Sequence, residues 1–192
     1  MALVIRNLCK FFAEKVIFDH FNYTFSDTGI YVLLGKSGCG KTTFLRIIAG
    51  LDKEYSGTVT SERVAFSFQE YRLFPTLTAL ENITKILWKN PTEAKINEAK
   101  ALLKTLGFSD ADTDRYPNEL SGGMKQRVSL CRALLSEKKV LLLDEPFKEI
   151  DDTLCEKLRS ILKQESKHRL IILTTHNLEI LGDLEKTVLA LD

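Results

Sequence analysis

The sequence predicts an α/β protein in which a sheet-containing core is interrupted by a helical lobe. The apolar run 30–34 is rich in strand-forming residues and leads into a glycine-rich turn and an amphipathic helix over 43–50. From Thr78 apolar residues recur at helical spacing, within a lobe that lies roughly between Tyr71 and Ser121, and strand composition returns at 140–143. Strand-rich segments on both sides of an all-helical insertion indicate one α/β core with a separate helical lobe.

The N-terminal segments predict strands. Residues 3–6 form a short apolar run, and a second strand is expected over 16–25, where aromatic and polar residues alternate from 21 to 25 at the period of a half-buried strand. Residues 27–29 form a turn before the run at 30–34, and two further strands are expected over 58–60 and 63–68.

The later segments predict helices with recognisable ends. Thr78 and Glu81 have the spacing of a capping box, so a helix is expected to start there. Gly107 ends a second helix over 92–106, and a third runs from about Ser121 to about Leu135. The remaining expected elements are a helix over 152–165 and strands over 170–173 and 188–191.

The composition limits the class of protein. The 192 residues are 44% hydrophobic and 28% charged with a formal net charge of +1, which favours a globular domain without a general attraction to nucleic acid. The N-terminus has no secretory signal pattern, so we expect a cytosolic chain. Its four cysteines are scattered without a C-x-x-C pair, and we expect reduced thiols without a metal site.

The glycine-rich turn has the pattern G-x-x-x-x-G-K-T and predicts a phosphate-binding site. Its glycines let backbone N–H groups surround an anion, and the following helix adds the positive end of its dipole. Lys41 is expected to reach the β- and γ-phosphates of a nucleotide, and the Thr42 hydroxyl is expected to bind Mg²⁺. The predicted nucleotide-binding residues of this segment are Gly35, Lys36, Ser37, Gly38, Cys39, Gly40, Lys41, Thr42 and Thr43.

Two acidic residues follow the apolar strand at 140–143. Asp144 is expected to hold Mg²⁺, and Glu145 is expected to activate a water molecule as a general base. An ordinary strand end with two solvated acids is the alternative, and a phosphate-binding loop in the same chain argues against it.

The string Leu120-Ser121-Gly122-Gly123, followed by Gln126 and Arg127, resembles the signature of the ATP-binding-cassette ATPases. A serine and two glycines at a helix start form a second anion cradle. In this family the cradle serves the nucleotide of the other subunit, so the resemblance implies that Ser121, Gly122 and Gly123 contact ATP across a head-to-tail homodimer.

The resemblance covers almost the whole chain and implies further roles. Gln69 matches the glutamine that contacts Mg²⁺ and the attacking water, and His176 matches the histidine near the γ-phosphate. Phe12 matches the aromatic residue that stacks on adenine, although core packing or a register that chooses Phe11 remain alternatives. The other two histidines, His20 and His168, are interpreted as surface or packing residues.

The implied architecture is a P-loop NTPase core with a mixed sheet, an N-terminal antiparallel β-subdomain and an inserted α-helical subdomain. One domain is expected over 1–192, with its core at about 1–70 and 136–192 and the helical subdomain at about 71–135.

Three departures from the family pattern stand out. Residues 148–151 read Lys-Glu-Ile-Asp, so Glu149 replaces a small residue that packs across the dimer interface. Asn177 follows the histidine where importers usually carry aspartate. Because the sequence reaches Asp192 soon after its last expected strand, we expect no C-terminal regulatory extension of the kind that some relatives have. Repulsion between two Glu149 side chains is expected to weaken an ATP-driven dimer.

The resemblance implies an ATPase subunit of an importer that binds ATP and Mg²⁺. The stretch 73–83 looks like importer-type cassettes, and the signature string looks most like the nitrate, sulfonate and taurine group. The expected partners are transmembrane permease subunits, an extracytoplasmic substrate-binding protein and a second copy of the chain, with no nucleic acid. The chain is then peripheral on the cytoplasmic face of the membrane. A soluble cassette ATPase acting on nucleic acid or protein assembly is the alternative, and an ATP-holding module without turnover is a third.

Overall fold

The computed structural model describes residues 3–13 and 15–191 of the chain. Contacts between residues divide the chain into two compact units. The core unit comprises Met1–Phe66, Lys138–Asp144 and Leu162–Asp192, and the helical unit comprises Ser67–Glu137 and Glu145–Ile161. The helical unit therefore includes residues 145–161, which the sequence analysis had assigned to the core.

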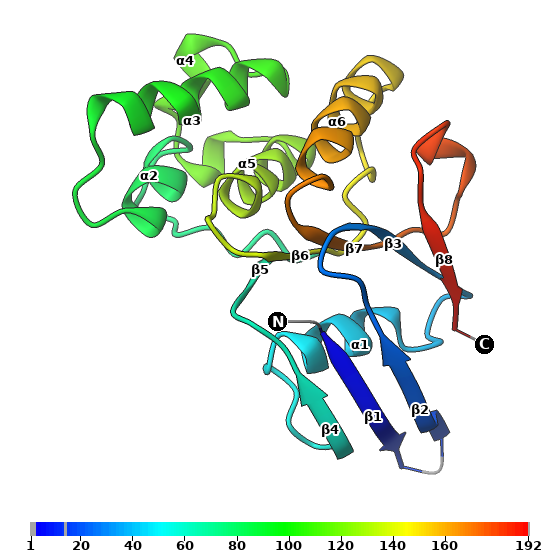
Figure 1. The fold of residues 1–192 in the computed structure, drawn as a ribbon. Helices are drawn as coiled ribbons and strands as arrows, with labels where there is room; N and C mark the ends of the chain where they lie inside the picture. Colours follow the sequence, from blue (N-terminus) through cyan, green and yellow to red (C-terminus); the bar gives the residue numbers. More distant parts are fainter. Residues whose placement is uncertain (1–2, 14, 192) are drawn as a thin grey trace. The chain divides into compact units, whose positions relative to one another are not determined.

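The core unit begins with a three-stranded antiparallel sheet. Its strands β1 (Val4–Phe12), β2 (Lys15–Thr24) and β4 (Ser56–Thr60) are arranged in the order β2-β1-β4 (Figure 1). The antiparallel N-terminal sheet is as expected, but β1 runs six residues beyond the predicted strand, which ended at Arg6. This extension carries Cys9, Lys10 and both phenylalanines that the sequence analysis weighed.

A second sheet of five strands completes the core unit, in the order β5-β6-β7-β3-β8. The strands are β5 (Val64–Ser67), β6 (Val140–Leu143), β7 (Leu170–Thr174), β3 (Gly29–Leu34) and β8 (Thr187–Ala190). The pairs β6–β7, β7–β3 and β3–β8 are parallel. Parallel strands bring their carboxyl ends to one edge of the sheet, so the turn after β3 and the residues after β6 and β7 meet there.

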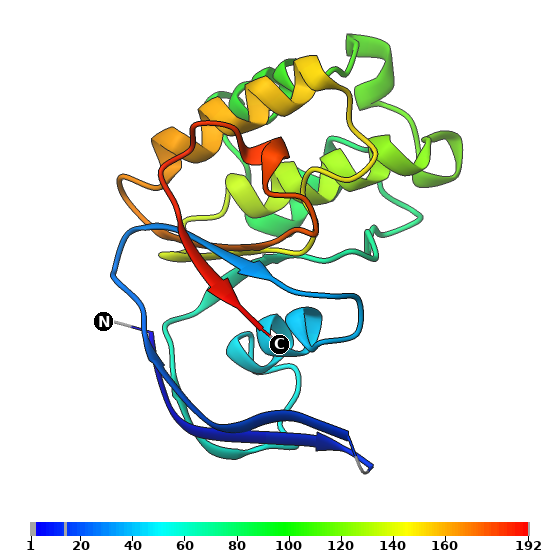
Figure 2. The same cartoon turned by 90° about the vertical axis from the view of Figure 1, so that its right-hand side faces the viewer.

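Helix α1 (Lys41–Ile48) lies between the two sheets (Figures 1 and 2). Its apolar face packs against both of them, because Phe44, Leu45 and Ile47 belong to one buried cluster with residues of β1, β2, β3, β6 and β7. Phe44 also contacts the ring of Phe18, with the ring centres 5.4 Å apart. This packing fixes the start of α1, and with it the glycine-rich turn.

The helical unit contains α2 (Glu81–Leu87), α3 (Glu93–Thr105), α4 (Asp110–Thr113) and α5 (Gly122–Leu134), and the greater part of α6 (Asp152–Glu165) belongs to it. Short helical turns also form over Pro117–Glu119 and Glu179–Leu181, and these and α4 were not predicted. The Thr78–Glu81 capping-box hydrogen bonds are present at 3.1 and 3.2 Å. Among the described residues, no helix has the length and apolar character that crossing a bilayer requires.

Candidate functional site

The glycine-rich turn joins β3 to α1 and wraps around the side chain of Lys41. The Lys41 Nζ donates hydrogen bonds to the carbonyl oxygens of Gly35, at 2.6 Å, and Lys36, at 2.9 Å. Lys15 on β2 donates to the Gly38 carbonyl at 2.9 Å. Two ammonium groups thus lie at this turn, beside the N-terminus of α1, and make it a site for an anion.

Two glycines of the turn are required by its geometry. Gly40 has a φ of +109°, and a Cβ there would lie 2.4 Å from Ile17 Cγ2, so a larger residue is excluded by both strain and space. Gly35 is required for a different reason, because a Cβ at this position would lie 2.3 Å from the carbonyl oxygen of Leu191. The turn can therefore follow this path only with glycine at both positions.

Asp144 is a buried acid of the core unit and accepts hydrogen bonds from two threonines. Thr42 Oγ1 on α1 donates to Asp144 Oδ2 at 2.8 Å, and Thr174 Oγ1 on β7 donates to Asp144 Oδ1 at 2.7 Å. The carboxylate is 4% exposed and Thr174 is fully buried. The structure thus brings together Thr42 and Asp144, the two residues predicted from separate motifs, and adds Thr174, which the sequence analysis did not identify.

His176 lies exposed in the turn that follows β7. The turn is built by its neighbours: the Thr175 Oγ1 donates to the Asn177 carbonyl oxygen at 3.0 Å, and Asn177 Oδ1 accepts from the Glu179 N–H at 2.9 Å. The asparagine that departs from the importer pattern therefore still performs the capping that an aspartate oxygen performs.

Phe12 and Phe11 are both about half exposed, but their surroundings differ. Phe12 lines a hollow together with Thr43 and Arg46 of α1. The Nζ of Lys10 lies 4.7 Å from the centre of the Phe12 ring. That ammonium is itself fixed, because it donates to Asp52 Oδ1 at 3.0 Å and to the Glu54 carbonyl oxygen at 2.7 Å.

The ion pair between Lys10 and Asp52 is largely buried, which the residue pattern of the strand did not predict. Lys10 is 1% exposed, and its ammonium and the Glu54 amide donate to the Asp52 carboxylate. Burial opposes ionisation of Asp52, but these hydrogen bonds, together with the positive charges of Lys10 and Arg46, outweigh it and lower the pKa of the carboxyl.

The signature segment forms the start of α5 in the helical unit. Ser121 caps the helix, its Oγ accepting from the Met124 N–H at 3.2 Å. A Cβ on Gly122 would lie 3.0 Å from Glu149 Oε2 and 3.1 Å from the Tyr71 hydroxyl oxygen. The Glu149 carboxylate oxygen and the Tyr71 hydroxyl oxygen therefore both lie next to Gly122.

Tyr71 and Glu149 interact directly at this point. The pKa of the Tyr71 phenol is raised, chiefly by burial. The negative charge of Glu149 and a hydrogen bond to its carboxylate raise this pKa further. Glu149 itself adopts a φ of +59°, in the left-handed region that side chains other than glycine rarely occupy. The unusual acidic residue thus has a partner within its own chain, which its position in the sequence did not suggest.

Glu145 also has an unusual backbone conformation, at a φ of +52°. Its carbonyl oxygen accepts a hydrogen bond from Gln126 Nε2 of α5 at 2.9 Å. The glutamine that follows the signature therefore holds the backbone of the predicted general base. Such strain at a single residue is typical of functional positions.

The exposed Gln69 lies two residues after β5, in a segment tied to α5. The Arg132 guanidinium donates to the carbonyl oxygens of Tyr71, at 3.5 Å, and Arg72, at 3.2 Å. Burial lowers the pKa of Arg132, and its guanidinium stays charged because the ordinary value is far above neutral. This segment is therefore connected to the helix that begins with the signature residues.

Comparison with known families agrees with this arrangement. A family described as "ABC transporter" matches residues 18–148, a span that includes the glycine-rich turn, the signature and both acids. This chain belongs to the ABC transporter family. The matched span covers more than half of the chain and reaches from β2 to the loop that contains Glu145.

Several ABC relatives are similar over nearly the whole chain. The sulfate/thiosulfate import ATP-binding protein CysA of Vibrio vulnificus is 38% identical over 93% of this chain and 57% of its own length. The aliphatic sulfonates import ATP-binding protein SsuB of Bacillus cereus is 36% identical over 93% of this chain and 76% of its own length. This ABC chain spans little more than half the length of the CysA relative.

Solved ABC cassettes have the same fold. A dimeric cassette in a post-hydrolysis state, bound to ADP and phosphate, superposes with a TM-score of 0.87 at 27% identity and covers 99% of this chain and 94% of the other. The predicted fold class, a P-loop core with an antiparallel β-subdomain and a helical subdomain, is confirmed by this likeness.

Within each unit, the structure relates the predicted site residues to one another. The core unit holds the glycine-rich turn, Asp144, His176 and Phe12, and the helical unit holds Gln69, the signature and Glu145. Sequence reasoning missed Lys10, Thr174 and Tyr71, which support these residues. The only sequence signal for Thr174 was a threonine at the end of a strand parallel to β6.

Proposed function

We propose that this chain binds ATP with Mg²⁺ and hydrolyses it, as the ATPase subunit of a transporter that imports its substrate through a separate permease. The observation that supports this most directly is the contact between Thr42 and Asp144, at 2.8 Å. It joins the end of the phosphate-binding turn to the acid after β6, in a chain of the ABC family.

The glycine-rich turn supplies the phosphate contacts in this proposal. Lys41 now donates to two carbonyl oxygens of its own turn, so its ammonium is already held at the place where phosphate oxygens would arrive. Lys15 is a second positive charge at the same turn. Phe12 is the proposed adenine-stacking residue, since its ring shares a hollow with Thr43 and Arg46.

The oxygens of Thr42 and Asp144 fit a Mg²⁺ ion, which prefers hydroxyl and carboxylate oxygens and keeps several of its waters. When bound, the ion neutralises charge on the phosphates. Thr174 orients Asp144 from the opposite side, because its hydroxyl donates to the other carboxylate oxygen. Gln69 is a proposed further contact to the ion and to the attacking water.

Glu145 is the proposed general base and His176 a proposed contact to the γ-phosphate. The Gln126 hydrogen bond to the Glu145 carbonyl holds the backbone of the base. Ser121, Gly122 and Gly123 are proposed to contact the nucleotide of a second copy of the chain, in an ATP-dependent homodimer.

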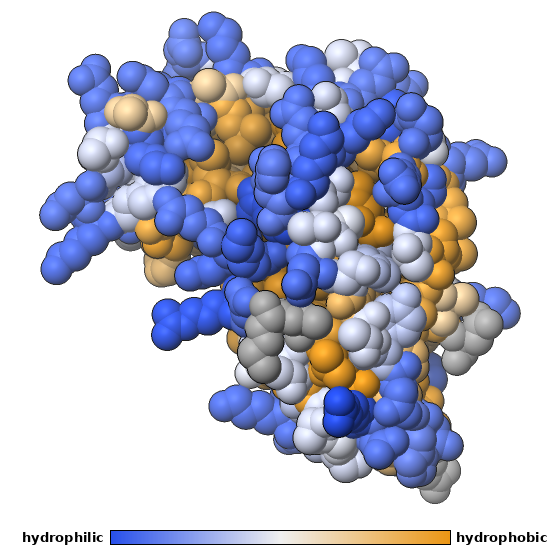
Figure 3. All heavy atoms as spheres, viewed as in Figure 1, coloured by the Kyte–Doolittle hydropathy of each residue, from blue (hydrophilic) through white to orange (hydrophobic). Residues whose placement is uncertain are grey.

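The helical unit is the proposed contact surface for the permease. Phe74 is 51% exposed in the loop before α2, and the buried Asn82 fixes this loop by accepting from the Phe74 N–H at 2.8 Å and donating to three carbonyl oxygens. Figure 3 shows apolar surface among the hydrophilic side chains of the helices. A rigid loop that exposes an aromatic side chain is suited to insertion into a partner.

The CysA and SsuB names support an oxyanion or organosulfur compound as the imported substrate. The proposed complex also includes an extracytoplasmic substrate-binding protein, and the chain would then lie on the cytoplasmic face of the membrane.

Two variants test the ATPase proposal. Glu145→Gln should keep ATP binding, measured by calorimetry, and lower phosphate release by roughly 10²–10⁴-fold, the usual contribution of a general base. Lys41→Ala should lose tight binding of MgATP because a charge-assisted contact to phosphate is removed. Hydrolysis at the wild-type rate by Glu145→Gln would contradict the assignment. If nucleic acid stimulated the wild-type ATPase and a permease did not, the transport role would be wrong.

A further inference from the structure

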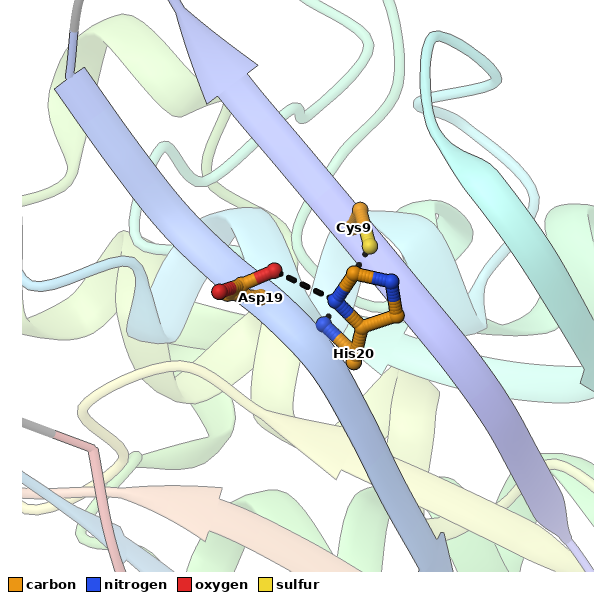
Figure 4. A group of neighbouring side chains, drawn as sticks. All are labelled: Cys9, Asp19 and His20. Carbon is orange, nitrogen blue, oxygen red and sulfur yellow. Dashed lines mark hydrogen bonds and ion pairs between the residues drawn. The ribbon is translucent and has the colours of Figure 1, made fainter.

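A cluster of three metal-ligating side chains lies on the three-stranded sheet, apart from the glycine-rich turn. Among residues 3–13 and 15–191, the Cys9 sulfur, a carboxylate oxygen of Asp19 and an imidazole nitrogen of His20 all lie within 4.8 Å of one another (Figure 4). The three residues come from the neighbouring strands β1 and β2. The sequence analysis expected no metal site at the cysteines, because they are scattered without a C-x-x-C pair.

A β-bulge brings the cluster together. Leu8 pairs with Phe21 and Lys10 pairs with Phe18, so the single residue Cys9 on β1 is opposite two residues, Asp19 and His20, on β2. Figure 4 shows the Asp19 carboxylate and the His20 ring meeting beside the Cys9 sulfur. A regular ladder would direct two consecutive side chains to opposite faces of the sheet.

The bulge is held by polar contacts on both strands. His20 has a φ of +48°, its N–H donates to the Cys9 sulfur at 3.2 Å, and its carbonyl oxygen accepts from Asn22 Nδ2 at 2.6 Å. Asn22 Oδ1 in turn accepts from the Asn7 N–H at 2.9 Å, where β1 has its own positive φ of +49°. The backbone that presents the three side chains is therefore held by asparagine side chains.

The chemistry of the three groups suits zinc. Thiolate, imidazole and carboxylate are its usual ligands, at bond lengths of about 2.0–2.3 Å. In a tetrahedral site ligand atoms are about 3.3–3.8 Å apart, so ligand atoms that lie within 4.8 Å of one another are near the spacing that one ion requires. The side chains of Asp19 and His20 are 68% and 76% exposed and can rotate, whereas Cys9 is buried and anchors the site. Mg²⁺ is disfavoured because it prefers oxygen ligands.

We propose that Cys9, Asp19 and His20 form a Zn²⁺ site with one open coordination position. Binding forms the Zn–S bond as the Cys9 thiol releases its proton to solvent, while His20 binds in its neutral form. Asp19 and His20, whose oxygen and Nδ1 are 2.6 Å apart, separate slightly to become two ligands of one ion. Cys9 lies two residues before Phe11 and three before Phe12, the proposed adenine-stacking residue, on the same strand. The proposed Zn²⁺ site does not depend on the proposed ATPase activity.

The test uses the full chain, freed of metal with a chelator and titrated with ZnCl₂ in calorimetry without nucleotide. We expect one Zn²⁺ per chain, release of protons to the buffer, and binding that excess Mg²⁺ does not reverse. With CoCl₂, a thiolate-to-cobalt charge-transfer band should appear, because only a sulfur ligand produces it. Absence of one-to-one binding, or of the band, would overturn the proposal.

Three variants locate the ion. Cys9→Ser should abolish the cobalt band, and His20→Asn should weaken Zn²⁺ binding at least about tenfold, as loss of a supporting or direct ligand does. Asparagine tolerates the positive φ of residue 20, so this variant should fold even if the buried Cys9→Ser does not. Cys39→Ser on the glycine-rich turn is the control and should bind as the wild type does. Wild-type affinity in His20→Asn, or loss of the band in Cys39→Ser, would show that the site is elsewhere.

Discussion

The hydrogen bond between Thr174 and Asp144 gives a prediction that links stability to metal binding. Thr174→Val keeps the shape of a fully buried side chain and removes a bond of 2.7 Å to a carboxylate that is 4% exposed. Hydrogen bonds to charged groups contribute about 1.5–3 kcal/mol, and little solvent is present here to replace the lost donor. We therefore expect the free energy of unfolding to fall by about 2 kcal/mol, which lowers Tm by roughly 4–8 °C.

The same substitution should raise the Mg²⁺ requirement of ATP hydrolysis. Thr174 and Thr42 donate to different oxygens of Asp144, so loss of one donor leaves the carboxylate less well oriented toward the ion. Loss of such a supporting contact costs about 10–100-fold in metal affinity. The half-saturating Mg²⁺ concentration should rise by about this factor, and excess Mg²⁺ should restore much of the rate.

Thr174→Ser is the matched control, because it keeps the hydroxyl and removes only a methyl group. It should lose about 1 kcal/mol of stability from the lost apolar contact and keep the wild-type Mg²⁺ dependence. The assays are denaturant unfolding and phosphate release over a Mg²⁺ titration. If the valine variant had the stability and the Mg²⁺ requirement of the wild type, the orienting role of Thr174 would be wrong.

Three further predictions concern charges and the exposed loop. The pKa of Asp52 is lowered in the folded state, so its ionised carboxylate stabilises the fold at pH values above the ordinary pKa of about 3.9. This stabilisation is lost as the pH falls through the folded-state pKa. Stability measured over an acid titration should therefore fall in the wild type and change less with pH in Asp52→Asn. Equal pH profiles would contradict it. Glu149→Ala should tighten the ATP-bound dimer in sedimentation, because it removes repulsion between the two copies of Glu149, and the effect should be larger at low salt than at high salt. Looser association would show that Glu149, which interacts with Tyr71 in its own chain, does not weaken the dimer by repulsion. Phe74→Asp should lower transport while basal hydrolysis persists, and transport at the full rate would remove Phe74 from the proposed contact.

The sequence alone determined the elements and the residues of the motifs. Strand, glycine-rich turn and helix follow each other within 21 residues from Ile30 to Gly50, and their pattern depends on short-range backbone preferences. The predicted helix over 152–165 matches α6 at both ends. Residues 3–6 were a less complete prediction, because β1 continues through Cys9 and Lys10, where buried side chains no longer alternate with exposed ones.

Tertiary structure alone decided which distant residues support the site. Parallel pairing of β6 with β7 aligns Leu143 with Leu173, and this register puts Thr174 beside Asp144. Likewise, Lys10 is buried because Asp52 and the Glu54 carbonyl oxygen, more than forty positions away, satisfy its charge.

The metal-ligating cluster shows the same limit of sequence reasoning. Neither Cys9 nor the Asp19–His20 pair carries a signal by itself, and only the two-against-one bulge between β1 and β2 brings them together. The backbone preferences for helix, strand and turn depend on residues close together in the chain, so the sequence predicts these elements. Register, bulges and the partners of buried charges follow from packing between segments far apart in the chain, and these are set only when the chain has folded.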